Sequence, residues 1–161
     1  MVNILLMDKL KFALEVNKIL VSSYVPAYNG ESAGLDLFNA GNKVTILPQT
    51  AVPKNNKLLI GTGLKMLVPK GYVALIQERG SITKTPLKVR AGVIDSGYTG
   101  EIFVNLINTS SEEYTLDSNA KLPVQIVVVK CDNEFEIVSE KEYLNLSASS
   151  IRKDGQIGSS D

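Results

Sequence analysis

The sequence predicts an all-β domain of the sandwich, barrel or jelly-roll type, with little helix. Three observations support this prediction. Short apolar runs recur between residues 44 and 129, turn residues separate them, and no long segment follows the 3.6-residue period of an amphipathic helix. The chain has 161 residues, of which 44% are hydrophobic and 21% charged, which is enough to bury one core. We therefore expect a single β domain over residues 1–150.

The expected elements follow one another along the chain. Residues 1–20 fit either a helix or a strand, because their apolar positions are compatible with both periods. Residues 82–88 could hold a short helix, which Pro86 would keep short. The predicted strands are residues 44–47, 57–60, 63–68, 72–77, 87–90, 102–107 and 122–129.

The two ends of the chain differ from this pattern. Residues 1–9 start apolar but are broken by Asp8 and Lys9, so we expect an ordered or frayed extension and neither a membrane span nor a secretory signal. Residues 151–161 are small, polar and contain glycine, which predicts a flexible C-terminal arm.

Composition excludes several classes of function. The 17 basic and 17 acidic residues balance, so no overall field holds nucleic acid or an anionic membrane, and we expect neither as a stable partner. The single cysteine, Cys131, cannot form an internal disulfide, which fits a cytoplasmic location, or the host-cell interior for a viral protein. Histidine is absent, which excludes Ser-His and Cys-His pairs. Acid–base chemistry near neutral pH must then use a carboxylate.

Residues 91–107 are the most informative stretch. An apolar run ends at Asp95, a Ser-Gly pair and Tyr98 follow, and a second apolar run starts at residue 102. Two such runs joined by turn residues predict a β-hairpin with a carboxylate and an aromatic ring at its tip. A small-molecule site is one interpretation of this tip. An ordinary surface turn is the other, since Asp, Ser and Gly are common turn formers.

Five segments occur in an order that resembles a known family. Residues 92–100 read G-V-I-D-S-G-Y-T-G, close to the pattern G-V-I-D-x-x-Y-x-G. The other four are S-A-G-L-D-L at 32–37, E-R-G-S-I-T at 78–83, K-L-P-V-Q at 121–125 and R-K-D-G-Q-I-G-S-S at 152–160. In this order they resemble the motifs of the trimeric dUTP pyrophosphatase (dUTPase) family. The resemblance covers nearly all of the chain and implies a distorted jelly-roll, barrel-like fold, with residues 151–161 closing over the active site.

The resemblance implies a reaction. A dUTPase hydrolyses dUTP to dUMP and pyrophosphate, which limits uracil incorporation into DNA and supplies dUMP for dTMP synthesis. Attack at the α-phosphorus needs a positioned water and neutralised charge. By the resemblance, Asp95 is the base that activates the water, while Arg79 and Gln125 act on the phosphates. Mg²⁺ bound mainly by the triphosphate is the implied cofactor, with Asp36 indirectly near it.

The resemblance also implies the substrate contacts and the assembly. The Tyr98 ring lies beneath the deoxyribose and leaves no room for a 2′-hydroxyl. The family forms a homotrimer with shared active sites, which we expect here from the resemblance alone. The implied substrate-binding residues are Gly92, Val93 and Ile94 for the uracil edge, Gly80 and Ser81 for phosphate oxygens, Arg152 for the γ-phosphate, and Ile157, Gly158 and Ser159 in the closing arm.

This chain departs from the family pattern in three motifs. The serine that usually follows the second-motif arginine is Gly80, and Ser81 could substitute from the next position. The fourth motif contains an additional Pro-Val step before Gln125. The fifth-motif phenylalanine is Ile157, which covers a base without offering an aromatic face.

Three alternative functions remain open at the level of sequence. A dCTP deaminase shares the fold but needs a carboxylate base at the position of Asn105, and asparagine cannot take up that proton. A non-catalytic or regulatory nucleotide-binding protein of the same fold is the second alternative. A purely structural β-sandwich is the third.

Overall fold

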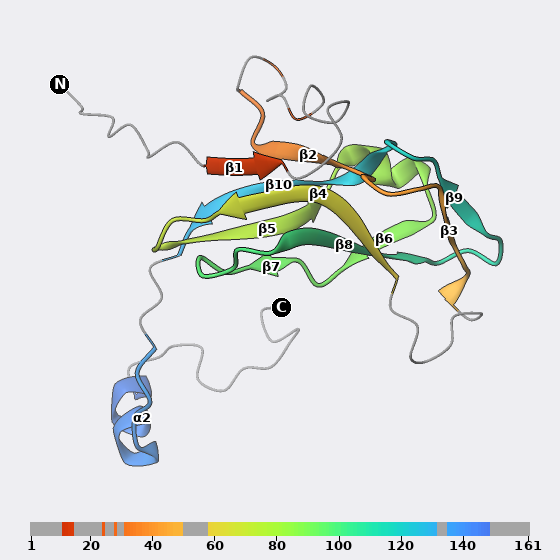
Figure 1. The fold of residues 1–161 in the computed structure, drawn as a ribbon. Coiled ribbons are helices and arrows are strands. Elements are labelled where there is room, and N and C mark those ends of the chain that lie inside the picture. The colour runs from red at the N-terminus through yellow and green to blue at the C-terminus, as the bar shows by residue number, and fades with distance from the viewer. Residues whose placement is uncertain are drawn as a thin grey trace.

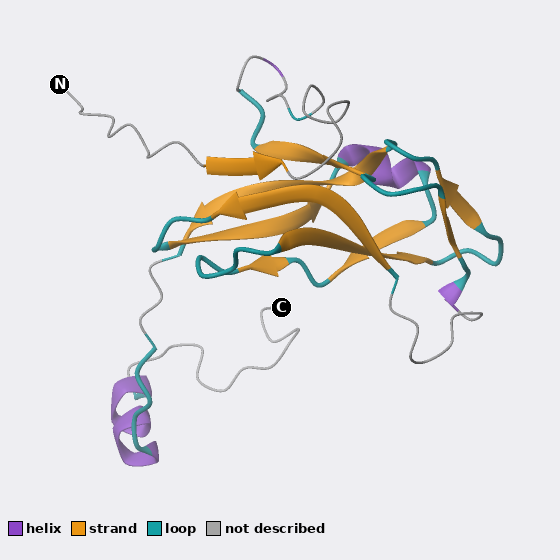
Figure 2. Ribbon diagram, in the orientation of Figure 1, coloured by secondary structure: helices purple, strands orange, loops and turns teal. Residues whose placement is uncertain are grey.

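The computed structural model describes residues 11–14, 24, 28, 31–49, 58–131 and 135–148, with only the backbone described for 11–14. Its strands form two four-stranded sheets and one two-stranded ribbon (Figures 1 and 2). The predicted all-β fold with little helix is therefore confirmed.

The two sheets are built from antiparallel neighbours that are distant in sequence. The β4–β8 sheet has the order β1 (Lys11–Leu14), β4 (Leu59–Leu67), β8 (Glu101–Asn108), β6 (Leu87–Arg90). The β10–β5 sheet has the order β2 (Gly34–Phe38), β10 (Lys121–Lys130), β5 (Tyr72–Glu78), β7 (Val93–Ile94). The ribbon pairs β3 (Val44–Ile46) with β9 (Tyr114–Leu116).

One hydrophobic core joins the sheets. In β8, Ile102, Val104 and Leu106 are buried and alternate with more exposed residues, as expected of a strand with one face on a core. Buried side chains of β10 and β5, such as Val124 and Ile76, belong to the same cluster. The core therefore fixes the registers of both sheets, because a slip of one residue would turn every apolar side chain outward.

Strand β4 merges two runs that the sequence separated. The runs 57–60 and 63–68 are joined in one strand, whose register with β8 shifts between Gly61 and Lys65. Gly63 has φ +65° at this irregularity, and its N–H donates to Glu101 Oε1 at 2.8 Å. The two predicted strands are therefore one continuous strand that contains a β-bulge.

The predicted hairpin at residues 91–107 is wrong. β7 pairs with β5 in one sheet, whereas β8 pairs with β4 and β6 in the other. Residues 91–100, here called the sheet-crossing segment, therefore leave the β4–β8 sheet after β6, add β7 to the β10–β5 sheet and return to β8. The turn signal at 95–98 was correct, but the burial of Ile94 between the sheets decides the partner of β7.

Two helices are described. The 3-10 helix η3 (Gly80–Lys84) begins two residues before the predicted 82–88 region, overlaps it over residues 82–84 and ends before Pro86. The α-helix α2 (Glu140–Ser147) was not predicted, although Ser139 and Glu142 match a helix-capping pattern and the Ser139 side chain accepts from Glu142 N–H. No residue of α2 is buried, and Figure 1 shows it apart from the sheets. No described helix is long and apolar enough to cross a membrane.

Candidate functional site

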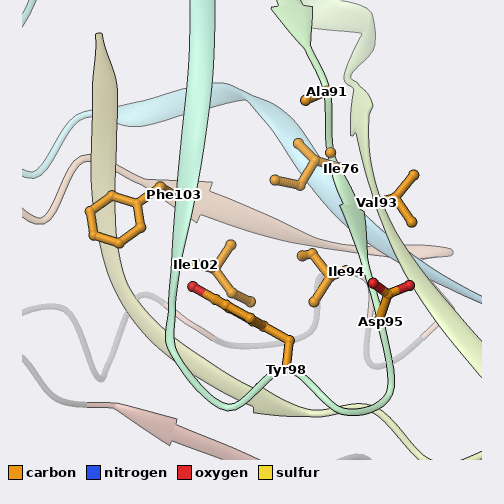
Figure 3. Close-up of a pocket in the computed structure, with 9 residues that line it drawn as sticks. Ile76, Ala91, Val93, Ile94, Asp95, Tyr98, Ile102 and Phe103 are labelled. Carbon is orange, nitrogen blue, oxygen red and sulfur yellow. The ribbon is translucent and has the colours of Figure 1, made fainter. Parts of the chain in front are cut away.

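A hollow of about 250 Å³ opens beside the sheet-crossing segment (Figure 3). It is smaller than the roughly 300–1,000 Å³ of complete small-molecule pockets. The hollow of a single chain therefore encloses less space than such a pocket. Its lining comes from β5, the sheet-crossing segment and β8: Ile76, Ala91, Gly92, Val93, Ile94, Asp95, Tyr98, Ile102 and Phe103.

Two positive φ angles turn the chain into this hollow. Ala91 has φ +60° and Gly92 has φ +124°. A Cβ on Gly92 would lie 3.1 Å from the Ile76 carbonyl oxygen, while the Gly92 carbonyl accepts from Ile76 N–H at 2.8 Å. Only glycine combines this backbone angle with so close an approach.

β7 forms an edge of its sheet. It pairs with β5 on one side, through Ala74 with Ile94 and Leu75 with Val93, and has no strand partner on the other side among the described residues. An edge strand keeps backbone N–H and C=O groups available for a ligand. The Val93 side chain is 68% exposed beside the hollow, so a ligand can reach this edge.

A tight turn holds the carboxylate and the ring. Tyr98 N–H donates to the Asp95 carbonyl at 3.0 Å, which closes a turn over Ser96 and Gly97. The Tyr98 hydroxyl donates to the Glu101 carbonyl, so the polar end of the ring is already bonded. Figure 3 shows the ring reaching across the hollow toward Ile102, with the exposed Asp95 carboxylate on the other limb of the turn.

A second group of polar residues gathers around Asp36. Arg79 Nε lies 2.6 Å from Asp36 Oδ1, and Lys121 Nζ lies 2.9 Å from Asp36 Oδ2. Gln125 stands opposite Asp36 in the pairing of β10 with β2. A Cβ on Gly34 would lie 2.6 Å from Gln125 Oε1, so this glycine leaves room for the Gln125 side chain.

The structure therefore separates the sequence-predicted residues into two groups. Gly92, Val93, Ile94, Asp95 and Tyr98 line the hollow. None of the other predicted residues within the described part of the chain belongs to that lining. Arg79 follows Ile76 by three residues and lies just past the end of β5, a spacing of about 10 Å for extended chain. The residues outside the hollow are Asp36, Arg79, Gly80, Ser81 and Gln125, whereas Arg152, Ile157, Gly158 and Ser159 lie outside the described residues.

Sequence reasoning missed several contributors. Ile76, Ile102 and Phe103 complete the hollow, and their pattern alone identified them only as strand residues. Lys121, to which the sequence analysis gave no role, makes an ion pair with Asp36. Asn105, the position used to argue against deamination, lies on β8 outside the lining of the hollow.

The fold and these two groups define a class of protein. It is a small all-β domain with an apolar hollow and a carboxylate at the rim of that hollow. A separate cluster holds the two cations Arg79 and Lys121 around Asp36. An apolar hollow suits a base and sugar, and cations suit phosphate oxygens.

Comparison with known proteins gives the family. The dUTPase family model matches residues 23–160. The deoxyuridine 5′-triphosphate nucleotidohydrolase of Escherichia phage T5 is 37% identical over 136 residues, 81% of this chain and 86% of that protein. The corresponding protein of Hydrogenobaculum sp. (strain Y04AAS1) is 33% identical over 150 residues, 91% and 96% of the two chains. The chain belongs to the dUTPase family.

Solved structures agree with the fold. A dUTPase from phage phi11 of S. aureus, described with a structural Mg(II) ion, superposes with a TM-score of 0.64 at 25% identity, covering 84% of this chain and 99% of that chain. The dUTPase of Staphylococcus bacteriophage 80alpha with dUpNHpp gives a TM-score of 0.71 at 24% identity, covering 96% and 99%.

Proposed function

We propose that this chain is a dUTP diphosphatase, which hydrolyses dUTP to dUMP and pyrophosphate, limits uracil incorporation into DNA and supplies dUMP for dTMP synthesis. One observation carries the proposal beyond family membership. The turn at residues 95–98 places a carboxylate and an aromatic ring at the rim of a nucleoside-sized hollow beside an exposed strand edge. We expect the protein to act in the cytoplasm, or inside the host cell if it is viral.

The hollow is assigned to the nucleoside. The edge of β7, with Gly92, Val93 and Ile94, offers backbone donors and acceptors to the uracil edge. The Tyr98 ring offers an apolar face to the deoxyribose, since its hydroxyl is bonded to the Glu101 carbonyl. A 2′-hydroxyl pressed against that face would lose its hydrogen bonds to water, which selects against ribose.

Asp95 is assigned to the attacking water. Its carboxylate is exposed at the rim of the hollow, where water and an α-phosphate can both reach it. The chain contains no histidine, so a carboxylate is the natural base at neutral pH. Asp95 accepts the proton of the water as its oxygen attacks phosphorus, and the pyrophosphate departs on the opposite side.

The second group is assigned to the phosphates. Arg79 supplies charged N–H donors, Gln125 supplies an amide, and Gly80 and Ser81 supply backbone N–H groups. Among the described residues, no three Asp, Glu, His or Cys side chains lie close enough to hold a metal ion. By resemblance to the family, Mg²⁺ would be held mainly by the triphosphate of the substrate. The arm at 151–161, with Arg152, Ile157, Gly158 and Ser159, is assigned to closure over the bound nucleotide.

A shared site in a homotrimer accounts for the two separate groups. The hollow of a single chain encloses less space than a complete small-molecule pocket, and the residues assigned to phosphate are not in its lining. Rotation about a threefold axis can bring Arg79 and Gln125 of one subunit to the hollow of another. Each site would then use residues of more than one chain.

The experiment is a pyrophosphate-release assay with dUTP, dTTP, dCTP and UTP. Wild-type protein should prefer dUTP over the other three. Asp95→Asn should lower turnover by about 100- to 10,000-fold, the usual contribution of a general base. Asp117→Asn is the matched control, because Asp117 is an exposed aspartate that pairs with Lys43 and belongs to neither group of site residues. No preference for dUTP, or full activity of Asp95→Asn, would contradict the proposal.

A further inference from the structure

The irregular start of β10 surrounds Arg79. Lys121 pairs with Phe38 and Gln125 pairs with Asp36, so four steps along β10 match two steps along β2. The two additional residues lie within the Leu122–Val124 stretch, which contains Pro123. Pro123 lacks an N–H and is suited to such a bulge. The consequence is a pair of carbonyls directed at Arg79.

Those carbonyls hold the arginine at two places. The backbone N–H of Arg79 donates to the Pro123 carbonyl at 2.9 Å. The Nη1 group of Arg79 lies 3.5 Å from the Leu122 carbonyl and 3.4 Å from Ser81 Oγ. These last two contacts are long, and they orient the guanidinium rather than bind it tightly.

Asp36 provides the short contact. Its Oδ1 lies 2.6 Å from Arg79 Nε, and its side chain is 17% exposed, against 25% for Arg79. Its second oxygen lies 2.9 Å from Lys121 Nζ, which also lies 5.6 Å from the centre of the Phe38 ring. A charge-assisted contact that is mostly shielded from water orients its partner far better than an exposed ion pair.

We infer that Asp36 is a positioning residue that fixes the Arg79 guanidinium with its Nη2 edge directed outward for a phosphate oxygen. Nε and Nη1 are engaged, and no described residue accepts from Nη2. Asp36, Arg79 and Lys121 together carry one net positive charge, which suits a polyphosphate. This inference rests on the proposed function, and it gives Asp36 a role that differs from the expected indirect one near the metal.

A metal role for Asp36 fits the structure less well. Both of its carboxylate oxygens already face cations, Arg79 Nε and Lys121 Nζ. Asp36 also belongs to no group of three potential metal ligands among the described residues. Positioning and metal binding therefore predict different responses to Mg²⁺.

The test is a double-mutant cycle with Asp36→Asn and Arg79→Gln, read as KM and kcat for dUTP. Asp36→Asn alone should raise KM about 10- to 100-fold, the range for a hydrogen bond to a charged group. It should leave the affinity for deoxyuridine, which has no phosphate, within about twofold. In the Arg79→Gln background, Asp36→Asn should change KM less than about twofold, because the guanidinium that Asp36 positions is absent.

A second variant covers the case in which Asp36→Asn does not fold, as judged by thermal unfolding. Arg79→Lys keeps a charge for Asp36 but has no second nitrogen to present, so its KM should be raised nearly as much as that of Arg79→Gln. Near wild-type KM for Arg79→Lys would overturn the inference. So would additive effects in the cycle, rescue of Asp36→Asn by raised Mg²⁺, or equal loss of deoxyuridine binding. Absence of dUTP turnover in wild-type protein would overturn the proposed function together with the inference.

Discussion

Gly100 allows the Tyr98 ring to lie across the hollow. A Cβ at this position would be 2.6 Å from Tyr98 Oη and 2.8 Å from Cζ, closer than atoms can approach. Gly100→Ala should therefore displace the ring and lower the preference for dUTP over UTP by about tenfold or more. The measurement is the ratio of kcat/KM for the two substrates.

Gly97 offers a matched control within the same turn. A Cβ on Gly97 would meet nothing within 4 Å, so Gly97→Ala adds the same methyl group without moving Tyr98. Its preference for dUTP should stay close to wild type. An unchanged preference in Gly100→Ala would show that the ring does not exclude ribose.

The raised pKa of the partly buried Tyr24 hydroxyl predicts a loss of folding stability at alkaline pH. Burial raises the pKa of Tyr24 from 10.0 to about 12. Between these values the folded state holds a proton that the unfolded state has released, so stability falls as pH rises from about 10 to about 12. Below that window the contribution of Tyr24 is constant.

Tyr24→Phe should remove this part of the alkaline loss, as measured by urea unfolding at about pH 9 and about pH 11. Tyr28→Phe is the control, since Tyr28 is 82% exposed. Residues that the three proteins share contribute equally and cancel in the comparison. An identical loss in wild type and Tyr24→Phe would contradict the assignment.

At the level of single elements, the bulge in β4 depends on the buried Thr62. The Thr62 hydroxyl donates to the Ile102 carbonyl at 2.7 Å and accepts from Leu64 N–H at 3.3 Å. Thr62→Val keeps the shape but removes two hydrogen bonds between the side chain and buried backbone groups. The expected loss is about 1–3 kcal/mol in the free energy of unfolding, measured with urea.

Thr45 is the comparison site for this substitution. Its hydroxyl meets only that of Thr115 at 3.4 Å on the exposed ribbon, so Thr45→Val should change stability by less than about 0.5 kcal/mol. Equal effects at the two sites would show that the bulge does not need the Thr62 hydroxyl.

On the scale of the whole molecule, shared sites predict rescue between two inactive variants. Arg79→Gln and Asp95→Asn chains should each have little activity alone. After unfolding and refolding together in equal amounts, about one quarter of all sites, one in each mixed trimer, should combine an intact Arg79 with an intact Asp95. Recovered pyrophosphate release, with light scattering to measure the mass, is the readout.

The controls are each variant refolded alone and the two mixed without unfolding, neither of which should gain activity. No recovery in co-refolded trimers would mean that each site uses residues of one chain. The two groups of polar residues would then have to meet through a movement within that chain.

The amino-acid sequence was sufficient to predict the all-β class and five of the nine residues that line the hollow. Alternating burial in strands such as β8 is a local pattern, and the combination of Asp95, Tyr98 and the absent histidine indicated the chemistry. The helix α2 was missed although its Ser139 cap was legible, because eight residues without a buried face show no clear period.

Strand partners could not be predicted in the same way, because pairing depends on contacts between distant segments. Residues 91–107 have the local signals of a hairpin, yet β7 joins β5 because Ile94 is buried between the sheets. The ion pairs of Asp36 likewise join residues up to 85 positions apart, through a bulge that only the pairing of β10 with β2 reveals. Local periodicity therefore determines the strands, and long-range burial determines which strands meet at the site.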